Sequence, residues 1–158
     1  LVIRKYEPKD LDEVLHLHRI ALEKIDAYDK SGKWDNDLFD IDRVYLIFLV
    51  GLMNNNIVAM GALKYMDEEK AEVKRMRVLP EFQKMGFGQA ILDTLEKEAR
   101  LRGFKKLCLD TTVRQIPAQH FYKKNGYKEM MRKTAGFPYE NIFYEKNIAM
   151  NTYPLVYV

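Results

Sequence analysis

The segment that most constrains the fold is 71–92, AEVKRMRVLPEFQKMGFGQAIL, where a β-rich run, a glycine turn and a helical pattern follow one another. The run ends at Pro80, and an amphipathic helix begins directly after Gly86 and Gly88. The first N–H groups of a helix have no partners within it, and the helix dipole adds partial positive charge there. Because glycine lacks a Cβ, an anion can approach this backbone closely. The segment therefore predicts either a phosphate-binding turn or an ordinary strand-to-helix connection.

Two common nucleotide sites do not fit this turn. A nucleoside-triphosphate loop has Lys and then Ser or Thr after its second glycine, whereas Gln89 and Ala90 follow Gly88. A dinucleotide fingerprint has Gly or Ala three residues after that glycine, where this chain has Ile91. A phosphate bound here therefore belongs to another class of ligand.

The composition indicates one globular domain of 158 residues, 47% hydrophobic and 31% charged. The longest apolar run, 44–53, is too short to cross a membrane and favours a buried strand. There is no signal-like segment, although a first residue of Leu1 rather than Met leads us to expect that the native start is missing. A single cysteine, Cys108, excludes an internal disulfide and predicts a cytoplasmic protein.

The charge pattern argues against nucleic acid as a partner, because a net charge of +3 is far from a clustered basic surface. Five basic residues are nevertheless expected around the glycine turn, where they would face a polyanion or form a solvated strand edge. They are Lys70, Lys74, Arg75, Arg77 and Lys84.

Covalent and metal chemistry are both disfavoured. The only serine, Ser31, lies in a polar loop, and Cys108 lies between two leucines, which predicts core packing rather than an activated nucleophile. His16 and His18 are two residues apart and would not face each other on a helix, so we expect no metal site.

The periodicities predict the order β-α-(α)-β-β-β-α-β-α-β-β in an α+β fold on one mixed sheet. Asn54–Asn56 predicts a hairpin, and Gly136–Pro138 predicts a turn. A helix from Gly88 to Gly103 makes the next strand parallel to the one before it. The expected strands are 2–6, 44–53, 57–65, 71–79, 106–111, 127–133 and 142–146, and the expected helices begin at Pro8 to Asp10, 38, Gly88 and 117.

Two spaced motifs accompany this order. Gln83, Gly86 and Gly88 form Gln-x-x-Gly-x-Gly, and the second motif comprises Gln115, Ala118, Tyr122, Gly126 and Tyr127. The chain thereby resembles the GNAT superfamily of acyl-CoA-dependent N-acetyltransferases, with mild departures at Gln115, usually Asn, and at Tyr127, usually Phe. The resemblance covers most of 2–147 and implies a mixed, mostly antiparallel central sheet in α/β/α layers. It implies one domain, 1–147, followed by a short extension, 148–158.

The resemblance also implies acetyl-CoA as the donor, with no metal. A β-bulge in the fourth strand would open a slot lined by the backbone of Met76, Arg77 and Val78, and the N–H of Met76 or Val78 would polarise the thioester carbonyl. Gln115 would contribute from the second motif. The pyrophosphate would bind the backbone amides of Gln83, Lys84, Met85, Gly86, Phe87, Gly88 and Gln89.

The family's chemistry implies a base and an acid. Glu72 is the candidate general base, acting through water, although it is equally compatible with a surface strand residue paired with Lys74. Tyr122 is the candidate general acid toward the thiolate, or alternatively a half-buried aromatic that packs on the cofactor. His120 is expected to be exposed.

The acceptor site is expected opposite the cofactor, between segment 28–45 and the turn 134–141. The first segment contains Tyr28, Trp34 and five aspartates that would suit a cationic amine, although the simpler account is that one aspartate caps a helix and the others are solvated. We expect a small-molecule or peptide amine, no nucleic acid, no membrane and, as one option, a homodimer. A non-catalytic acyl-CoA sensor and a scaffold domain without ligand remain alternatives. The aspartates are Asp29, Asp35, Asp37, Asp40 and Asp42.

Overall fold

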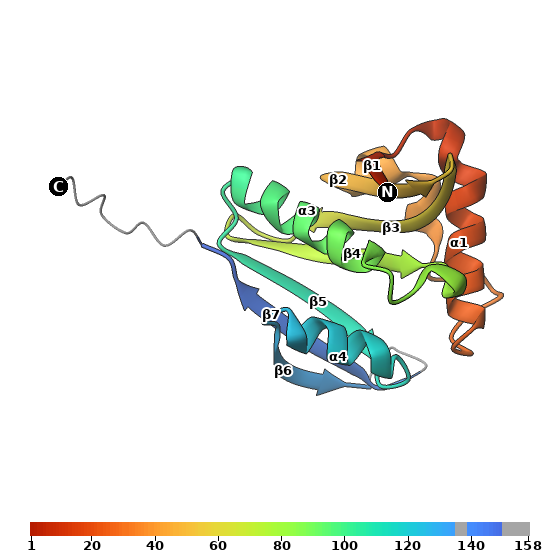
Figure 1. The fold of residues 1–158 in the computed structure, drawn as a ribbon. Coiled ribbons are helices and arrows are strands. Elements are labelled where there is room, and N and C mark those ends of the chain that lie inside the picture. The colour runs from red at the N-terminus through yellow and green to blue at the C-terminus, as the bar shows by residue number, and fades with distance from the viewer. Residues whose placement is uncertain (135–138, 150–158) are drawn as a thin grey trace.

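The computed structural model describes residues 1–134 and 139–149, which form one seven-stranded sheet in the order β1-β2-β3-β4-β5-β7-β6 (Figure 1). Only β4 and β5 pair in parallel, as the helical crossover between them predicts. The strands are β1 (Val2–Lys5), β2 (Ile47–Met53), β3 (Asn56–Tyr65), β4 (Lys70–Val78), β5 (Lys106–Thr112), β6 (Lys128–Lys133) and β7 (Asn141–Asn147). The α-helices are α1 (Leu11–Glu23), α2 (Ile41–Val44), α3 (Phe87–Leu101) and α4 (Ile116–Lys124).

The predicted element order is confirmed, and the differences concern boundaries. The strand expected over 44–53 begins only at Ile47, because 41–44 form the short helix α2. The helix expected from 38 is divided between a 3-10 turn, Asn36–Phe39, and α2. Asn54 and Asn55 adopt φ of +51° and +64°, which confirms the hairpin. The predicted Gly136–Pro138 turn and most of the predicted extension lie outside the described residues.

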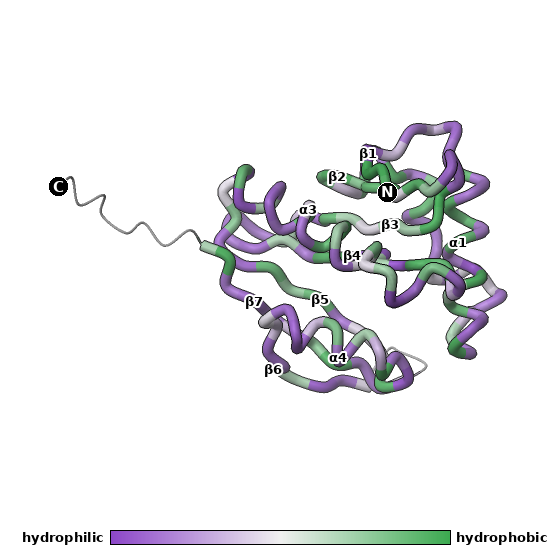
Figure 2. The backbone as a smooth tube through the Cα atoms, viewed as in Figure 1, coloured by the Kyte–Doolittle hydropathy of each residue, from purple (hydrophilic) through white to green (hydrophobic). Residues whose placement is uncertain are grey.

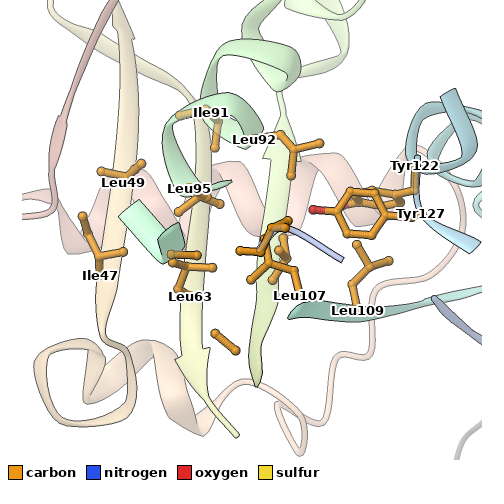
Figure 3. Packing of buried hydrophobic residues seen from close by; sticks show 14 of the residues in the cluster. Ile47, Leu49, Leu63, Ile91, Leu92, Leu95, Leu107, Leu109, Tyr122 and Tyr127 are labelled. Carbon is orange, nitrogen blue, oxygen red and sulfur yellow. The ribbon is translucent and has the colours of Figure 1, made fainter. Parts of the chain in front are cut away.

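Helices cover both faces of the sheet, and each face has its own core. Figure 3 shows Ile91, Leu92 and Leu95 of α3 against Leu49 and Leu63 of the sheet. On the other face, side chains of α1 pack with 3-10 and α2 residues and with β2 and β3; these are Val14, Leu17, Leu38, Ile41, Tyr45, Phe48, Val50, Ile57, Met60 and Ala62. Figure 2 shows the hydrophobic stretches of β2 and β5 and the hydrophilic outer turns of α3. The strands β2 and β3 are therefore buried on both sides, whereas β6 is exposed.

A bulge interrupts β4 in the middle of the sheet. Lys74 pairs with Ala62 and Arg77 with Met60, so two residues, Arg75 and Met76, face the single residue Gly61. Arg75 takes a left-handed φ of +58° to accommodate the extra residue. The predicted bulge is therefore confirmed.

The bulge coincides with the point where β4 and β5 separate. Their pairing runs only from Lys70 with Lys106 to Glu72 with Cys108, although β4 continues to Val78 and β5 to Thr112. Figure 1 shows the two strands side by side at one end and diverging toward the other. The sheet thus opens between its fourth and fifth strands, beside the N-terminus of α3.

Candidate functional site

The glycine turn presents its backbone rather than its side chains. Gly86 has φ of +87° and stands at the N-cap of α3, and Lys84 is also left-handed at +61°. Among the described residues, the backbone N–H groups of 84–89 donate to no turn or cap acceptor. The first turn of a helix offers such amides, together with the positive end of the dipole, to an anion. The arrangement therefore suits a phosphate.

The side chains of the turn point elsewhere. Phe87 is buried in the core against Phe82, with ring centroids 5.8 Å apart. The Gln89 amide donates to the Asn125 side chain at 2.7 Å, which ties α3 to α4. The Gln83 amide donates to the carbonyl of Val78 at 3.3 Å. Of the residues that we expect to hold the cofactor here, each would therefore act mainly through its main chain.

The space around Gly88 indicates whether this glycine is needed for packing within the protein or for the approach of a ligand. A Cβ added there would lie 3.6 Å from Val78 Cγ2 and 3.9 Å from Phe121 Cζ, which is ordinary van der Waals contact. Packing within the protein therefore leaves room for alanine at this position. A close approach from outside, as expected of a pyrophosphate, would remove that room.

A cleft of about 260 Å³ occupies the space between the separated strands. One wall is β4, the other is the end of β5 with the start of α4, and α1 and the loop that follows it close the far side. Of the predicted site residues, Met76, Arg77, Gln115 and Tyr122 line this cleft, and Glu72 does not. Further lining residues are His18, Leu22, Ala27, Asp29, Trp34, Asp35, Val73, Lys74, Arg75, Asp110, Thr111, Thr112, Ala118, Tyr139 and Asn141.

Tyr122 stands at the centre of the cleft's second wall. Its side chain is 6% exposed, and its ring packs between Phe121 and Tyr127. Burial raises the pKa of the phenol, Asp110 adds to the rise, and the positive charge of Arg77 opposes it. The hydroxyl therefore keeps its proton at neutral pH and is available as a donor.

Glu72 lies outside the cleft, in the last residue pair that joins β4 to β5 before the strands separate. The carboxylate is half-buried, 4.0 Å from Lys74 Nζ, so the pairing that we weighed against a catalytic role is present. Burial raises the pKa of Glu72 above its ordinary value, while Lys74 lowers it and Asp110 raises it further. Glu72 thus combines an ion pair with a perturbed carboxyl group near the cleft.

Cys108 is only partly a core residue, contrary to our expectation. Leu107 and Leu109 are buried, but strand alternation turns Cys108 to the opposite face. Its thiol contacts the carbonyl of Ala71 at 3.7 Å. Burial, reinforced by Glu72, raises the pKa of the thiol to about 12, so Cys108 remains protonated.

Two aspartates of the acidic loop, Asp35 and Asp37, are held by basic side chains. Arg75 Nε donates to Asp37 at 2.9 Å, its Nη2 donates to the carbonyl of Trp34 at 2.6 Å, and His18 Nε2 contacts Asp35 at 2.9 Å. The short helices that begin in this segment have no side-chain cap. Asp35 and Asp37 are therefore neither helix caps nor solvated residues, and they hold the loop against the bulge.

The predicted basic cluster is not assembled at the turn. Lys70 pairs with Glu145 at 3.0 Å, Arg75 pairs with the acidic loop, and the Arg77 side chain lies in the cleft. Of the five residues, only Lys84 belongs to the turn itself. That expectation was wrong because Lys70 and Lys74 alternate with Ala71 and Val73, which pack on the α3 side. In addition, the bulge turns Arg77 to the face away from α3.

Sequence reasoning missed Asp110 and His18 as cleft residues. Asp110 lies on the polar face of β5 and accepts a hydrogen bond from Asn141 Nδ2 at 2.7 Å. His18 is buried, and burial together with Arg77 and Arg75 lowers its pKa to about 4. The available signals were a charge inside an apolar strand and a histidine on the apolar face of a helix. His120 is exposed, as expected.

Residues 1–134 and 139–149 contain no group of three or more His, Cys, Asp or Glu placed to hold a metal ion. Across the same residues, none of the helices has the length and apolar character to span a membrane.

Comparison with known proteins places this geometry in context. The sequence model of the acetyltransferase (GNAT) family matches residues 11–127 of this chain. An IAA acetyltransferase of Azospirillum brasilense is 32% identical over 115 residues, which cover 68% of this chain and 74% of that protein.

Solved structures share the fold. A GNAT-family acetyltransferase of Staphylococcus aureus Mu50 superimposes with a TM-score of 0.83 and 24% identity, over 93% of this chain and 98% of the other. The PaiA N-acetyltransferase of Thermoplasma acidophilum, solved in complex with coenzyme A, gives a TM-score of 0.76 and 22% identity, over 92% and 98% of the two chains. The predicted α+β architecture, with a mixed and mostly antiparallel sheet, is therefore confirmed.

Proposed function

The chain belongs to the GNAT acetyltransferase family, and we propose that it moves an acetyl group from acetyl-CoA to a primary amine by direct attack in a ternary complex. The observation that carries the proposal is the separation of β4 from β5 beside the start of α3, which opens a cleft between the strands, while the backbone amides of 84–89 have no turn or cap acceptor among the described residues. Donor and acceptor can then meet from opposite sides of the sheet. We retain a cytoplasmic location and a homodimer as predictions only.

The glycine turn would hold the pyrophosphate of the donor. The N–H groups of 84–89 have no turn or cap acceptor among the described residues, whereas that of Gln83 donates to Pro80, and an alanine Cβ at Gly88 would meet only ordinary contacts. A structure of the same fold was solved in complex with coenzyme A, which supports a coenzyme A thioester as the donor. When bound, acetyl-CoA supplies an activated acetyl thioester.

The free edge of β4 would orient that thioester. The N–H of Leu79 donates to Val58 in β3, so strand alternation directs the N–H of Val78 toward the open side. The N–H of Met76, two residues earlier, is the alternative donor. Either amide would stabilise negative charge that develops on the carbonyl oxygen during attack.

Tyr122 and a carboxylate would carry the two proton transfers. The protonated phenol of Tyr122 is the acid that meets the departing sulfur. Glu72 is the base that we expect to act through water, because it lies at the closed end of the gap rather than in the cleft. Asp110 is a second candidate, since its carboxylate lines the cleft directly. Comparing the pH–rate profiles of Glu72→Gln and Asp110→Asn distinguishes the two.

The test is release of free thiol from acetyl-CoA across a panel of amines, with the N-acetyl product identified by mass spectrometry. We expect amine-dependent release with one acetylated amine per thiol. Binding of acetyl-CoA by calorimetry, with no turnover of any amine, would replace the proposal with the acyl-CoA sensor. Absence of both binding and turnover would favour a scaffold.

A further inference from the structure

Arg77 is a half-buried cation whose Nε is fully buried and which has no acidic partner among the described residues. Its Nη1 donates to the carbonyl of Met76 at 2.8 Å, and its buried Nε has no partner among the described residues. No ion pair within 4.0 Å joins Arg77 to a carboxylate in that part of the chain. The remaining residues, 135–138 and 150–158, contain neither Asp nor Glu. The protein therefore supplies this guanidinium with no carboxylate side chain of its own.

The neighbouring Arg75, in contrast, has two carboxylate partners. It contacts Asp37 and Asp35 and closes the loop onto the bulge. Burial and the repulsion from Arg75 lower the pKa of Arg77 to about 10, which still leaves it charged at neutral pH. A buried charge without a counterion is costly, so an anion that arrives with a ligand would be strongly favoured. The groups that interact electrostatically with Arg77 are Arg75, Tyr122, Asp35 and Tyr45.

Arg77 lies on the acceptor side of the sheet. It pairs in register with Met60, whose side chain belongs to the core on the α1 face. Met76, by contrast, turns toward α3, where its Sδ would lie 2.5 Å from a Cβ added at Gly61. The sheet thus separates the guanidinium from the glycine turn. We therefore do not expect Arg77 to bind the phosphates of the donor.

The opposite wall of the cleft carries the complementary charge. Burial raises the pKa of the Tyr122 phenol, and Asp110 on β5 raises it further, whereas Arg77 on β4 lowers it. The cleft is therefore lined by a cation from β4, an anion from β5 and the phenol of Tyr122 from α4. A volume of about 260 Å³ suits a small molecule.

We propose that the acceptor is a free amino acid or a similar small molecule that carries a carboxylate beside its amine. Arg77 binds the carboxylate, and the amine faces Asp110 and Tyr122. The inference rests on the proposed acetyl transfer and narrows its substrate class. A peptide amine does not fit it, because the free carboxylate of a peptide is remote from its N-terminal amine.

The test uses matched acceptors in the thiol-release assay: an amino acid, its amide and the amine that remains after decarboxylation. Phenylalanine, phenylalaninamide and phenethylamine form one set, and lysine, lysinamide and cadaverine form another. We expect the amino acid to have a kcat/KM about 10- to 150-fold higher than the other two, the range that a charge-assisted hydrogen bond provides.

Variants of Arg77 test whether this residue causes the preference for acceptors that carry a carboxylate. Arg77→Gln is expected to abolish the preference while the KM for acetyl-CoA stays the same, and Arg77→Lys is expected to keep part of it. Arg43→Gln is the charge-matched control, because Arg43 is exposed and, among the described residues, forms an ion pair with Asp40 alone. Equal rates within each set, or a preference that survives in Arg77→Gln, would overturn the inference while leaving acetyl transfer intact.

A second measurement decides the matter if no amine is acetylated. Calorimetry with the same acceptors in the presence of coenzyme A would then report binding alone. Binding of the amino acid that Arg77→Gln weakens at least tenfold supports the carboxylate site. Absence of binding, or binding that is indifferent to Arg77→Gln and Arg77→Lys, refutes it.

Discussion

The two sides of the opened sheet are built differently. On the side proposed for the donor, the turn exposes the main-chain amides of 84–89, and its side chains point into the core, into solvent or toward α4. On the acceptor side, the cleft is formed by charged side chains from distant parts of the chain, among them His18, Arg77 and Asp110. A donor that is shared by a whole family requires only a backbone conformation, whereas an acceptor that varies requires particular side chains.

The first prediction tests the donor side at its most sensitive point. Gly86→Val should abolish acetyl-CoA binding, because valine disfavours the φ of +87° that aims the amides of the turn. Isothermal calorimetry measures the affinity, and circular dichroism checks that the fold survives.

Gly103→Val is the matched control for this variant. Gly103 has φ of +86°, has nothing within 4 Å of an added Cβ, and lies at the other end of α3. Both variants carry the same backbone strain. If Gly103→Val loses acetyl-CoA to the same extent, or if Gly86→Val retains it, the turn does not hold the donor.

The second prediction separates chemistry from binding on the acceptor side. Tyr122→Phe should lower kcat by about 10- to 1,000-fold with little change in acetyl-CoA affinity, since only the acidic proton is lost. Steady-state kinetics measures the change. Tyr144→Phe is the control, because Tyr144 is also a buried tyrosine whose hydroxyl lacks a partner among the described residues. Equal turnover in Tyr122→Phe and the wild type would remove Tyr122 from the chemistry.

The third prediction concerns pH, which should affect the acceptor side through His18. The pKa of His18 falls from 6.5 to about 4 on folding, so the unfolded chain binds a proton that the folded chain does not. Stability is therefore lost as pH falls below 6.5. Between pH 7 and pH 5 the loss should be about 2 kcal/mol.

Urea unfolding at the two pH values measures this loss. His18→Gln should remove it, and His16→Gln should not, because His16 is exposed two residues away. A wild-type stability that does not change between pH 7 and pH 5 would contradict the burial of a neutral His18.

The fourth and smallest effect sharpens the donor side again. Gly88→Ala should raise the free energy of unfolding by about 0.5 kcal/mol, because alanine favours the helix and the added methyl group meets only ordinary contacts. The same methyl group should weaken acetyl-CoA binding about tenfold. Unfolding measures the expected gain in stability, and calorimetry on the same sample measures the expected loss of affinity for acetyl-CoA. An unchanged affinity would show that the donor does not bind close to Gly88.

The donor side could be predicted from the sequence because its signals are local. Gly86 and Gly88 mark the turn, Ile91 and Leu95 mark the buried face of the helix, and all four lie within ten residues. The hairpin at Asn54 and Asn55 was predictable for the same reason. A backbone conformation that is determined by residues close in the sequence can be predicted from those residues.

The acceptor side could not be predicted because its contacts join residues that are far apart in the chain. Arg75 and Asp37 are 38 residues apart, and His18 and Asp35 are 17 apart. Nothing local distinguishes Asp35 from a helix cap or Arg77 from a solvated strand residue. The bulge at Arg75 also reverses the face of the residues after it, so simple alternation along β4 misplaces them.

Initial rates measured over a matrix of acetyl-CoA and amine concentrations test the central claim most directly. If the donor on its turn and the acceptor in its cleft are bound together, reciprocal plots against one substrate at fixed levels of the other intersect. Parallel lines would show that the acetyl group first passes to the protein, and a rate independent of the amine would show that no acceptor is used.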